Sequence, residues 1–349
     1  MTLSGTNNVI LKRNKIDINK LCFILLFVFA WIMFALNYSN ADYANYENAY
    51  NAISEGKKDS YFELGFKILI KVFTFFNLPY QVFLAFVALL CLTIFTIVIR
   101  CLTSRYSLAF LLYIIYPFAF DIVQYRNMLS FSFVLLGICC LLSNKSSAKM
   151  RAFKYLLFVL IGSLFHSSAI VYSLLVLVTV KKEKIFYALL IILLVLVMLF
   201  SLKVELFIPI LKAIKLDRYA RYEYDRNIST FLQYFAFYVF LLILAAWKFD
   251  KKRNSVKFRL LLVSSAFLPF IIMNGTSARL IRNVLILFYC FLFDKFNKKE
   301  TLNDLKQGTI VIFTFAAVMF VFYSQLASGL YYDLVLRPVF EYNFLIGKL

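Results

Sequence analysis

The single histidine of the sequence, His166, stands among small polar residues that interrupt an apolar stretch. Its neighbours include Ser163, Ser167 and Ser168, and an interrupted helix inside a membrane usually marks a binding site. Imidazole is also the one side chain whose ordinary pKa makes it a base near neutral pH. We therefore predict that His166 acts as a general base or forms a hydrogen bond with substrate. A buried histidine with a purely structural role is the alternative.

Carboxylates and tyrosines gather in the segment that follows the first apolar run. Carboxylates accept hydrogen bonds from sugar hydroxyl groups, and aromatic rings provide platforms for sugar faces. The predicted sugar-binding residues are Tyr43, Tyr46, Glu47 and Glu63. Asp42 is the second candidate for the base. The alternative is an aromatic belt at the membrane interface with a solvated acidic face.

Arginine is enriched in segments that we place outside the membrane, where the usual excess of cytoplasmic cations does not explain it. A guanidinium group presents a planar fork of donors that matches phosphate oxygens. Uncompensated charge is costly at helix ends near the membrane plane, and a lipid-linked diphosphate would lie at that level. The predicted diphosphate-binding residues are Arg126, Arg279, Arg282, Arg218 and Arg337. Ion pairs with nearby acidic residues, or contacts with ordinary lipid headgroups, are the alternative.

The six cysteines lie inside apolar runs or beside their ends, without the spacing of a zinc site. No Asp-x-Asp metal motif occurs in the segments placed outside. We expect free thiols, no metal and no cofactor.

Transmembrane helices must position these residues. Hydrophobic residues make up 63% of the sequence and the mean hydropathy is +0.81, whereas a soluble domain is about 45–50% apolar. An all-α fold is expected because backbone exposed to lipid must satisfy its own hydrogen bonds. We attribute the net charge of +20 to cytoplasmic loops and anionic lipid, and we expect no nucleic acid partner.

We predict a polytopic protein with about eleven membrane crossings, some short or broken. The N-terminus is placed in the cytoplasm and the C-terminus in the periplasm, and residues 1–349 are expected to form one transmembrane domain. Leu21–Leu36 follows a basic stretch without a small-residue cleavage site, so we expect a retained helix. Tyr106–Ile122 is expected to cross once, and Glu63–Phe76 to lie at the interface. The main outer segments are expected at residues 37–79, 203–230 and 324–349.

A parity argument divides the apolar stretch Tyr155–Val180. Basic clusters flank it on both sides, and the basic loop Lys248–Arg259 is also placed in the cytoplasm. Two crossings, Ile185–Leu202 and Phe231–Lys248, connect the later pair of cytoplasmic loops. The number of crossings between any two cytoplasmic loops must be even. Tyr155–Val180 therefore crosses twice or not at all. Two short helices with an outer turn near His166 satisfy this requirement.

Five short motifs occur in an order that resembles the EpsG-like, Wzy-type polymerases of bacterial O-antigen and exopolysaccharide. They are Asp-Tyr-x-x-Tyr at 42–46, Glu-x-Gly-Phe at 63–66, Tyr-Arg-Asn at 125–127, Phe-His-Ser-Ser-Ala at 165–169 and a late arginine turn with Arg279 and Arg282. The resemblance extends over most of the chain. The sequence departs from the family pattern at Leu64, where proline is common, and at Asn127 and Met128, where a small or apolar residue is common. The motifs do not decide which late arginine matches the family.

The resemblance implies a metal-independent, inverting glycosyltransferase in the bacterial inner membrane, with an active site facing the periplasm. The implied donor is a polymer on undecaprenyl diphosphate, and the acceptor is the non-reducing sugar of a lipid-linked repeat unit. His166 or Asp42 would be the base, and the arginines would stabilise the departing diphosphate. Through the resemblance alone, a chain-length regulator protein is an expected partner. Membrane lipid is a further partner.

Other functions stay open from the residues alone. An O-antigen ligase-like enzyme should have a larger outer domain than this sequence provides. A flippase or transporter for lipid-linked sugars should show internal repetition and charges in the middle of the membrane, and we find neither clearly. A membrane acyltransferase usually pairs its histidine with an aspartate, and no aspartate is adjacent to His166 in the sequence.

Overall fold

The computed structural model describes residues 18–57, 62–143, 145–203, 227–249, 256–294 and 301–345. Within these ranges the regular elements are all helices, as the predicted all-α class requires. In the described part of the chain, eight spans are long and apolar enough to cross a membrane. The structure is therefore that of a polytopic membrane protein, while the number of crossings and their sidedness stay predictions.

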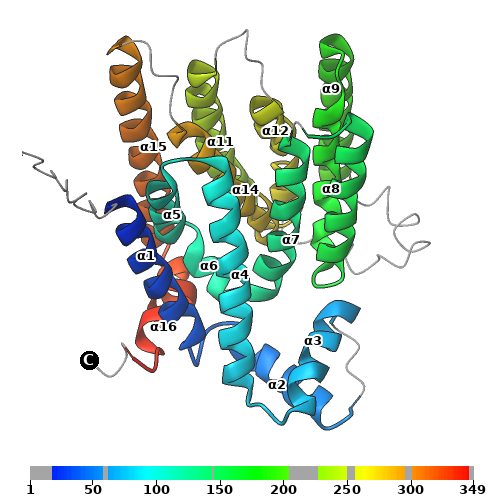
Figure 1. Cartoon of the computed structure of the whole chain (residues 1–349), viewed down its shortest axis with the longest axis vertical. Coiled ribbons are helices and arrows are strands. Elements are labelled where there is room, and N and C mark those ends of the chain that lie inside the picture. The colour runs from blue at the N-terminus through cyan, green and yellow to red at the C-terminus, as the bar shows by residue number, and fades with distance from the viewer. Residues whose placement is uncertain are drawn as a thin grey trace, which may run out of the picture.

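The long helices lie side by side in one bundle, and two short helices, α2 (Tyr43–Ser54) and α3 (Leu64–Phe75), lie beyond one end of it (Figure 1). The candidate spans are α1 (Ile18–Ala35), α4 (Tyr80–Leu102), α7 (Tyr125–Leu142), α9 (Glu183–Leu202), α11 (Ile228–Lys248), the broken helix formed by α12 (Val256–Ser264), η5 (Ser265–Phe267) and α13 (Phe270–Met273), the pair η6 (Gly275–Ser277) and α14 (Ala278–Phe293), and α15 (Thr301–Ala327). The shorter elements are α5 (Tyr106–Ile115), α6 (Phe118–Val123), α8 (Ala148–Ser163), η1 (Ser167–Thr179), η7 (Tyr332–Leu336) and α16 (Arg337–Glu341).

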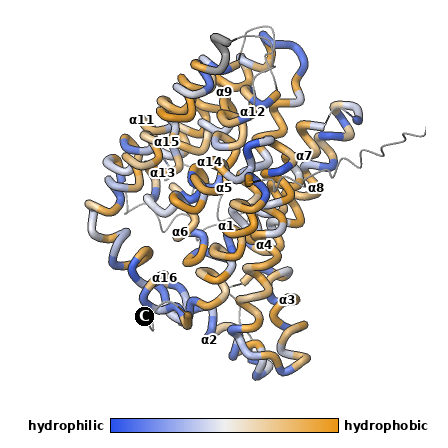
Figure 2. Tube along the Cα trace, turned by 60° about the vertical axis from the view of Figure 1, so that its left-hand side comes forward, coloured by the Kyte–Doolittle hydropathy of each residue, from blue (hydrophilic) through white to orange (hydrophobic). Residues whose placement is uncertain are grey.

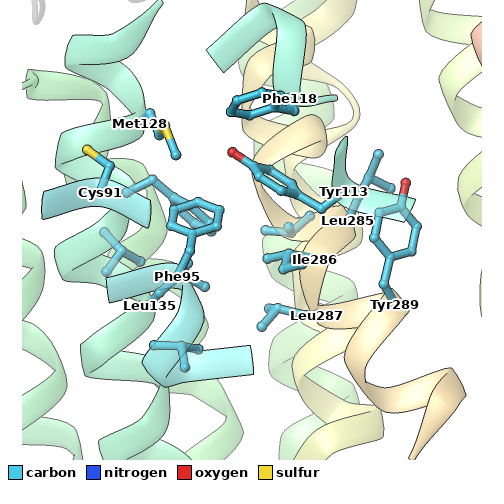
Figure 3. Packing of buried hydrophobic residues seen from close by; sticks show 14 of the residues in the cluster. Cys91, Phe95, Tyr113, Phe118, Met128, Leu135, Leu285, Ile286, Leu287 and Tyr289 are labelled. Carbon is cyan, nitrogen blue, oxygen red and sulfur yellow. The ribbon is translucent and has the colours of Figure 1, made fainter. Parts of the chain in front are cut away.

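The core of the bundle surrounds α14, whose side chains are buried along nearly its whole length. Phe95 of α4 and Tyr113 of α5 pack with ring centroids 5.0 Å apart, and both lie beside Leu285 and Ile286 of α14 (Figure 3). The peripheral helices α9 and α15 instead expose large apolar side chains. Most of the residues along the helices of the bundle are hydrophobic, as the orange parts of the trace show (Figure 2). Such a surface suits contact with lipid.

The expected break at His166 is present. Helix α8 ends at Ser163, η1 begins at Ser167, and the two helices pack against each other. Gly162 permits this turn to approach α7 closely, because an added Cβ would lie 2.8 Å from the carbonyl oxygen of Ser130. The Ser130 hydroxyl also donates a hydrogen bond to the Gly162 carbonyl at 2.8 Å. The hairpin that carries His166 is thus fixed to α7.

The stretch Tyr106–Ile122, which is expected to cross once, is not one continuous helix. The chain forms α5 and then α6, with the break at Tyr116 and Pro117. Proline has no backbone N–H to continue the hydrogen-bond pattern of a helix and clashes with the preceding turn. The Tyr289 hydroxyl donates to the Tyr116 carbonyl at 3.0 Å, so a side chain of α14 satisfies a backbone acceptor at this break.

The segment around α16 is tied to the end of α1. The amide nitrogen of the Asn37 side chain donates to the carbonyls of Pro338 and Tyr342, at 3.0 and 3.2 Å. The backbone N–H of Phe344 donates to the Leu36 carbonyl at 3.0 Å. Residues more than 300 positions apart therefore hold the start of the segment that carries Asp42.

Candidate functional site

A polar pocket of about 230 Å³ lies where several helices begin. It is lined by Asp42, Asn45, Tyr46, Phe62, Gln124, Arg126, Asn127, His166 and Arg279. Five of the predicted site residues meet here although they are distant in the sequence. They are Asp42, Tyr46, Arg126, His166 and Arg279.

The N-termini of α2, α7, η1 and α14 converge on this pocket. Asp42, Gln124 and His166 are the N-cap residues of the first three helices, and Arg279 is in the first turn of α14. A helix N-terminus carries partial positive charge and unpaired backbone N–H groups, so it favours an anion. The backbone therefore adds to the positive field of the two arginines.

Arg126 lies in the first turn of α7 and is held from two sides. Its Nη1 atom is 3.5 Å from Oε2 of Glu63, the N-cap residue of α3. Its guanidinium group stacks on the Phe62 ring, 4.4 Å from the centroid. Among the residues that the structure describes, neither Nε nor Nη1 has a hydrogen-bond partner, although both atoms are buried. Arg126 therefore keeps donors for an anionic ligand in the pocket.

Glu63 is a support of the pocket and does not line it. While one carboxylate oxygen faces Arg126, the other accepts a hydrogen bond of 3.0 Å from the backbone N–H of Ser167. Glu63 thus connects the arginine of α7 with the N-terminus of η1, directly after His166.

Asp42 lies between α1 and α2 in a position set by its neighbours. Its backbone N–H donates to the side-chain oxygen of Asn40 at 3.0 Å. Burial raises the pKa of its carboxyl group above the ordinary value of 3.8, against the opposing effects of Arg126, Asn45 and Arg279. A carboxylate with a raised pKa is a stronger base, which is the property that proton abstraction needs.

His166 is oriented by its own helix. The backbone N–H of Ser168 donates to Nδ1 at 3.2 Å, and the Ser168 hydroxyl oxygen lies 2.8 Å from the same nitrogen. A backbone amide can only donate, so Nδ1 is an acceptor here. The neutral imidazole consequently carries its proton on Nε2.

A buried chain of amides continues behind His166 and was not predicted from the sequence. The Asn127 side chain donates to Asn283 Oδ1 at 3.3 Å, and Asn283 donates to the Tyr172 hydroxyl at 2.8 Å. All three side chains are almost fully buried. The chain joins α7, α14 and η1, the helices that present Arg126, Arg279 and His166. Asparagine inside two helices that are candidate membrane spans was the available signal.

The two late arginines have different surroundings. Arg279 lines the pocket, whereas Arg282 is buried with its guanidinium group 3.8 Å from the centroid of the Phe120 ring. Arg282 still adjoins the site, since its Nη2 donates to Gln124 Oε1 at 3.4 Å. Arg218 lies outside the described residues.

Three further predicted residues do not line the pocket. The Tyr43 hydroxyl donates to Gln81 Oε1 at 3.1 Å. Glu47 lies on α2, one residue beyond Tyr46. Arg337 is exposed on α16 and forms an ion pair of 2.8 Å with Glu341, which matches the alternative given for it above. In the described part of the chain, no three His, Cys, Asp or Glu residues are grouped as metal ligands.

The helices and the pocket define a class: an all-helical, multi-pass membrane protein with a cationic site at the helix N-termini. The chain belongs to the EpsG family, whose model matches residues 20–343. Membership of this family indicates a membrane protein of polysaccharide biosynthesis. No curated protein and no solved structure matches the chain.

Proposed function

We propose that the protein is a polysaccharide polymerase of the bacterial inner membrane. It transfers a growing glycan from undecaprenyl diphosphate to the non-reducing end of a lipid-linked repeat unit, in a pocket that faces the periplasm. The observation that carries this proposal is the meeting of Asp42, Arg126, His166 and Arg279 in one pocket. Two cations for a diphosphate and two groups that handle a proton are what such a transfer needs.

In this mechanism the acceptor hydroxyl oxygen attacks the anomeric carbon from the face opposite the diphosphate. The new glycosidic bond forms while the bond between the anomeric carbon and the diphosphate oxygen breaks, so the configuration inverts. The bonding electrons leave with the diphosphate, whose charge Arg126, Arg279 and the helix N-termini stabilise. The hydroxyl proton passes to a carboxylate or imidazole base.

The surroundings of the two candidate bases favour Asp42. Its pKa is raised by burial, and its carboxylate accepts a proton without any change of tautomer. The Nδ1 atom of His166 is already an acceptor for the Ser168 amide, so Nε2 carries the proton of the neutral ring. His166 is therefore assigned a hydrogen bond to the substrate, donated from Nε2.

The test is the length distribution of surface polysaccharide in a strain that lacks this gene. Complementation with the wild type should restore a ladder of chain lengths. Asp42→Asn and Arg126→Ala should leave only single capped repeat units, whereas the matched controls Glu47→Gln and Arg337→Ala, outside the pocket, should restore the ladder. Loss of even the single unit in the deletion strain would contradict a polymerase and would instead indicate a ligase or a flippase.

A further inference from the structure

A second pocket, of about 200 Å³, adjoins the polar one and has the opposite character. Its apolar walls are Ile170, Val171, Phe200, Phe270, Met273 and Leu280. Arg279 lines both pockets, and the apolar pocket also includes Ser167 and Ser168, the two residues after His166. A guanidinium group thus stands at the border between a polar and an apolar compartment.

One wall of this apolar pocket is formed by aromatic and sulfur-containing side chains. Met273 packs with Phe200 and Phe270, and Phe270 also packs against the main core. The two phenylalanine rings meet nearly edge to face, with centroids 6.1 Å apart and an interplanar angle of 67°. Methionine and aromatic side chains adapt readily to an irregular apolar ligand.

The pocket adjoins the surface that faces lipid. Ile170, one of its lining residues, is 57% exposed. Phe200 belongs to α9, a peripheral helix that also exposes Leu199 and Leu202 near the same end. An apolar chain that enters beside Arg279 can therefore continue into the bilayer without crossing a polar surface.

We propose that the apolar pocket binds the first isoprene units of the polyprenyl carrier, with the diphosphate at Arg279 and the sugars in the polar pocket. This assignment rests on the proposed function. The volume suffices, because a cavity of ~150 Å³ lined by apolar side chains accepts a benzene ring. Charge selects this occupant over an ordinary phospholipid, since Arg126 and Arg279 both act on the polar pocket and together suit two phosphates.

Photo-crosslinking of the purified full chain in nanodiscs tests the assignment. The probe is farnesyl diphosphate with a diazirine on its first isoprene unit, and no acceptor sugar is present. We expect labelled peptides from η1 and α13. Unlabelled farnesyl diphosphate should abolish the labelling, and added phosphatidylglycerol should not. Labelling elsewhere, or equal competition by phosphatidylglycerol, would overturn the proposal.

A pair of variants gives a second measurement. Ile170→Trp places a larger side chain at the mouth of the pocket and should weaken farnesyl diphosphate binding about tenfold, a loss of ~1.4 kcal/mol. Its affinity for inorganic diphosphate should not change. The control is Leu196→Trp, at a similarly exposed position of α9 that lines neither pocket. Equal binding by both variants would contradict the proposal.

Both measurements are independent of polymer formation. If polymer forms while the probe labels another surface, the lipid pocket is wrong and the polymerase stands. If the probe labels the pocket while the deletion strain keeps its ladder of chain lengths, the polymerase proposal is wrong.

Discussion

Glu63 Oε2 lies 3.5 Å from Arg126 Nη1, and each of the two side chains is about 15% exposed. The pair joins α3 to α7, and the second carboxylate oxygen of Glu63 holds the N-terminus of η1 through Ser167. An ion pair in this setting orients the guanidinium group and still leaves it donors for a ligand. The arginine proposed to bind the substrate diphosphate is therefore also the one whose position depends on the packing of three helices.

Arg126→Lys keeps the positive charge and removes the planar fork of donors. We expect the rate of glycan transfer to fall about 100-fold, comparable to the loss of a preorganised donor at an oxyanion site. The measurement is the initial rate of purified enzyme with lipid-linked repeat units. Arg337→Lys is the matched control, because Arg337 pairs with Glu341 on the surface. A near-normal rate in the Arg126 variant would exclude bidentate phosphate binding.

The rate should depend on pH through Asp42. In the proposed mechanism the ionised carboxylate is the active base. Burial raises its pKa above 3.8, so activity should be lost as the pH falls through that raised pKa. Asn45 donates a hydrogen bond that lowers this pKa. Asn45→Ala should therefore move the acidic limb of the pH–rate profile to higher pH. The exposed Asn48→Ala on the same helix should leave the limb in place, and an unmoved limb in the Asn45 variant would argue against Asp42 as the base.

Substitution of His166 should separate the role of a donor from that of a base. His166→Gln retains an N–H donor but no group that accepts a proton near neutral pH. We expect this variant to keep more activity than His166→Ala, while Asp42→Asn loses nearly all of it. Initial rates of the three purified variants provide the comparison. If His166→Gln were as inactive as Asp42→Asn, His166 would be the better candidate for the base.

The buried amide chain behind the site should be energetically coupled. Asn283→Leu removes the acceptor of the Asn127 amide and the donor to the Tyr172 hydroxyl, which should cost about 1–3 kcal/mol of unfolding free energy. Tyr172→Phe should cost a similar amount, and the double variant should cost less than the sum. Thermal unfolding in detergent measures all three. Strict additivity would mean that the hydrogen bond of 2.8 Å between these side chains contributes no coupling.

The sequence was sufficient for the positions of most long helices, because a span must be a long apolar run. It also predicted the hairpin at His166, since the charges of flanking loops restrict the number of crossings. The break at Pro117 was missed although proline disrupts a helix interior. The long apolar run there favours one continuous element, and its hydropathy outweighs the single proline.

Side-chain direction was the part of the site that the sequence could not provide. Arg279 and Arg282 are three residues apart, and only the rotation of α14 in the bundle decides which one lines the pocket. The contact between Asn127 and Asn283 joins residues 156 positions apart, so no local pattern could indicate it. Sugar binding by Glu63 stays a prediction, and its contacts with Arg126 and with the backbone of Ser167 depend on elements distant in the sequence.

The hydrogen bonds between Asn37 and the segment around α16 have a consequence for the synthesis of the protein itself. Asn40 donates to Asn37 at 2.7 Å and also positions the backbone of Asp42, so the proposed base is linked to residues that leave the ribosome late. A chain whose translation stops before α16 would hold the arginines proposed to bind the donor but would lack a fixed Asp42. Truncation after Leu336 should accordingly give a protein that inserts into the membrane and makes no polymer. The order of synthesis would then act as a safeguard against premature consumption of lipid-linked sugar.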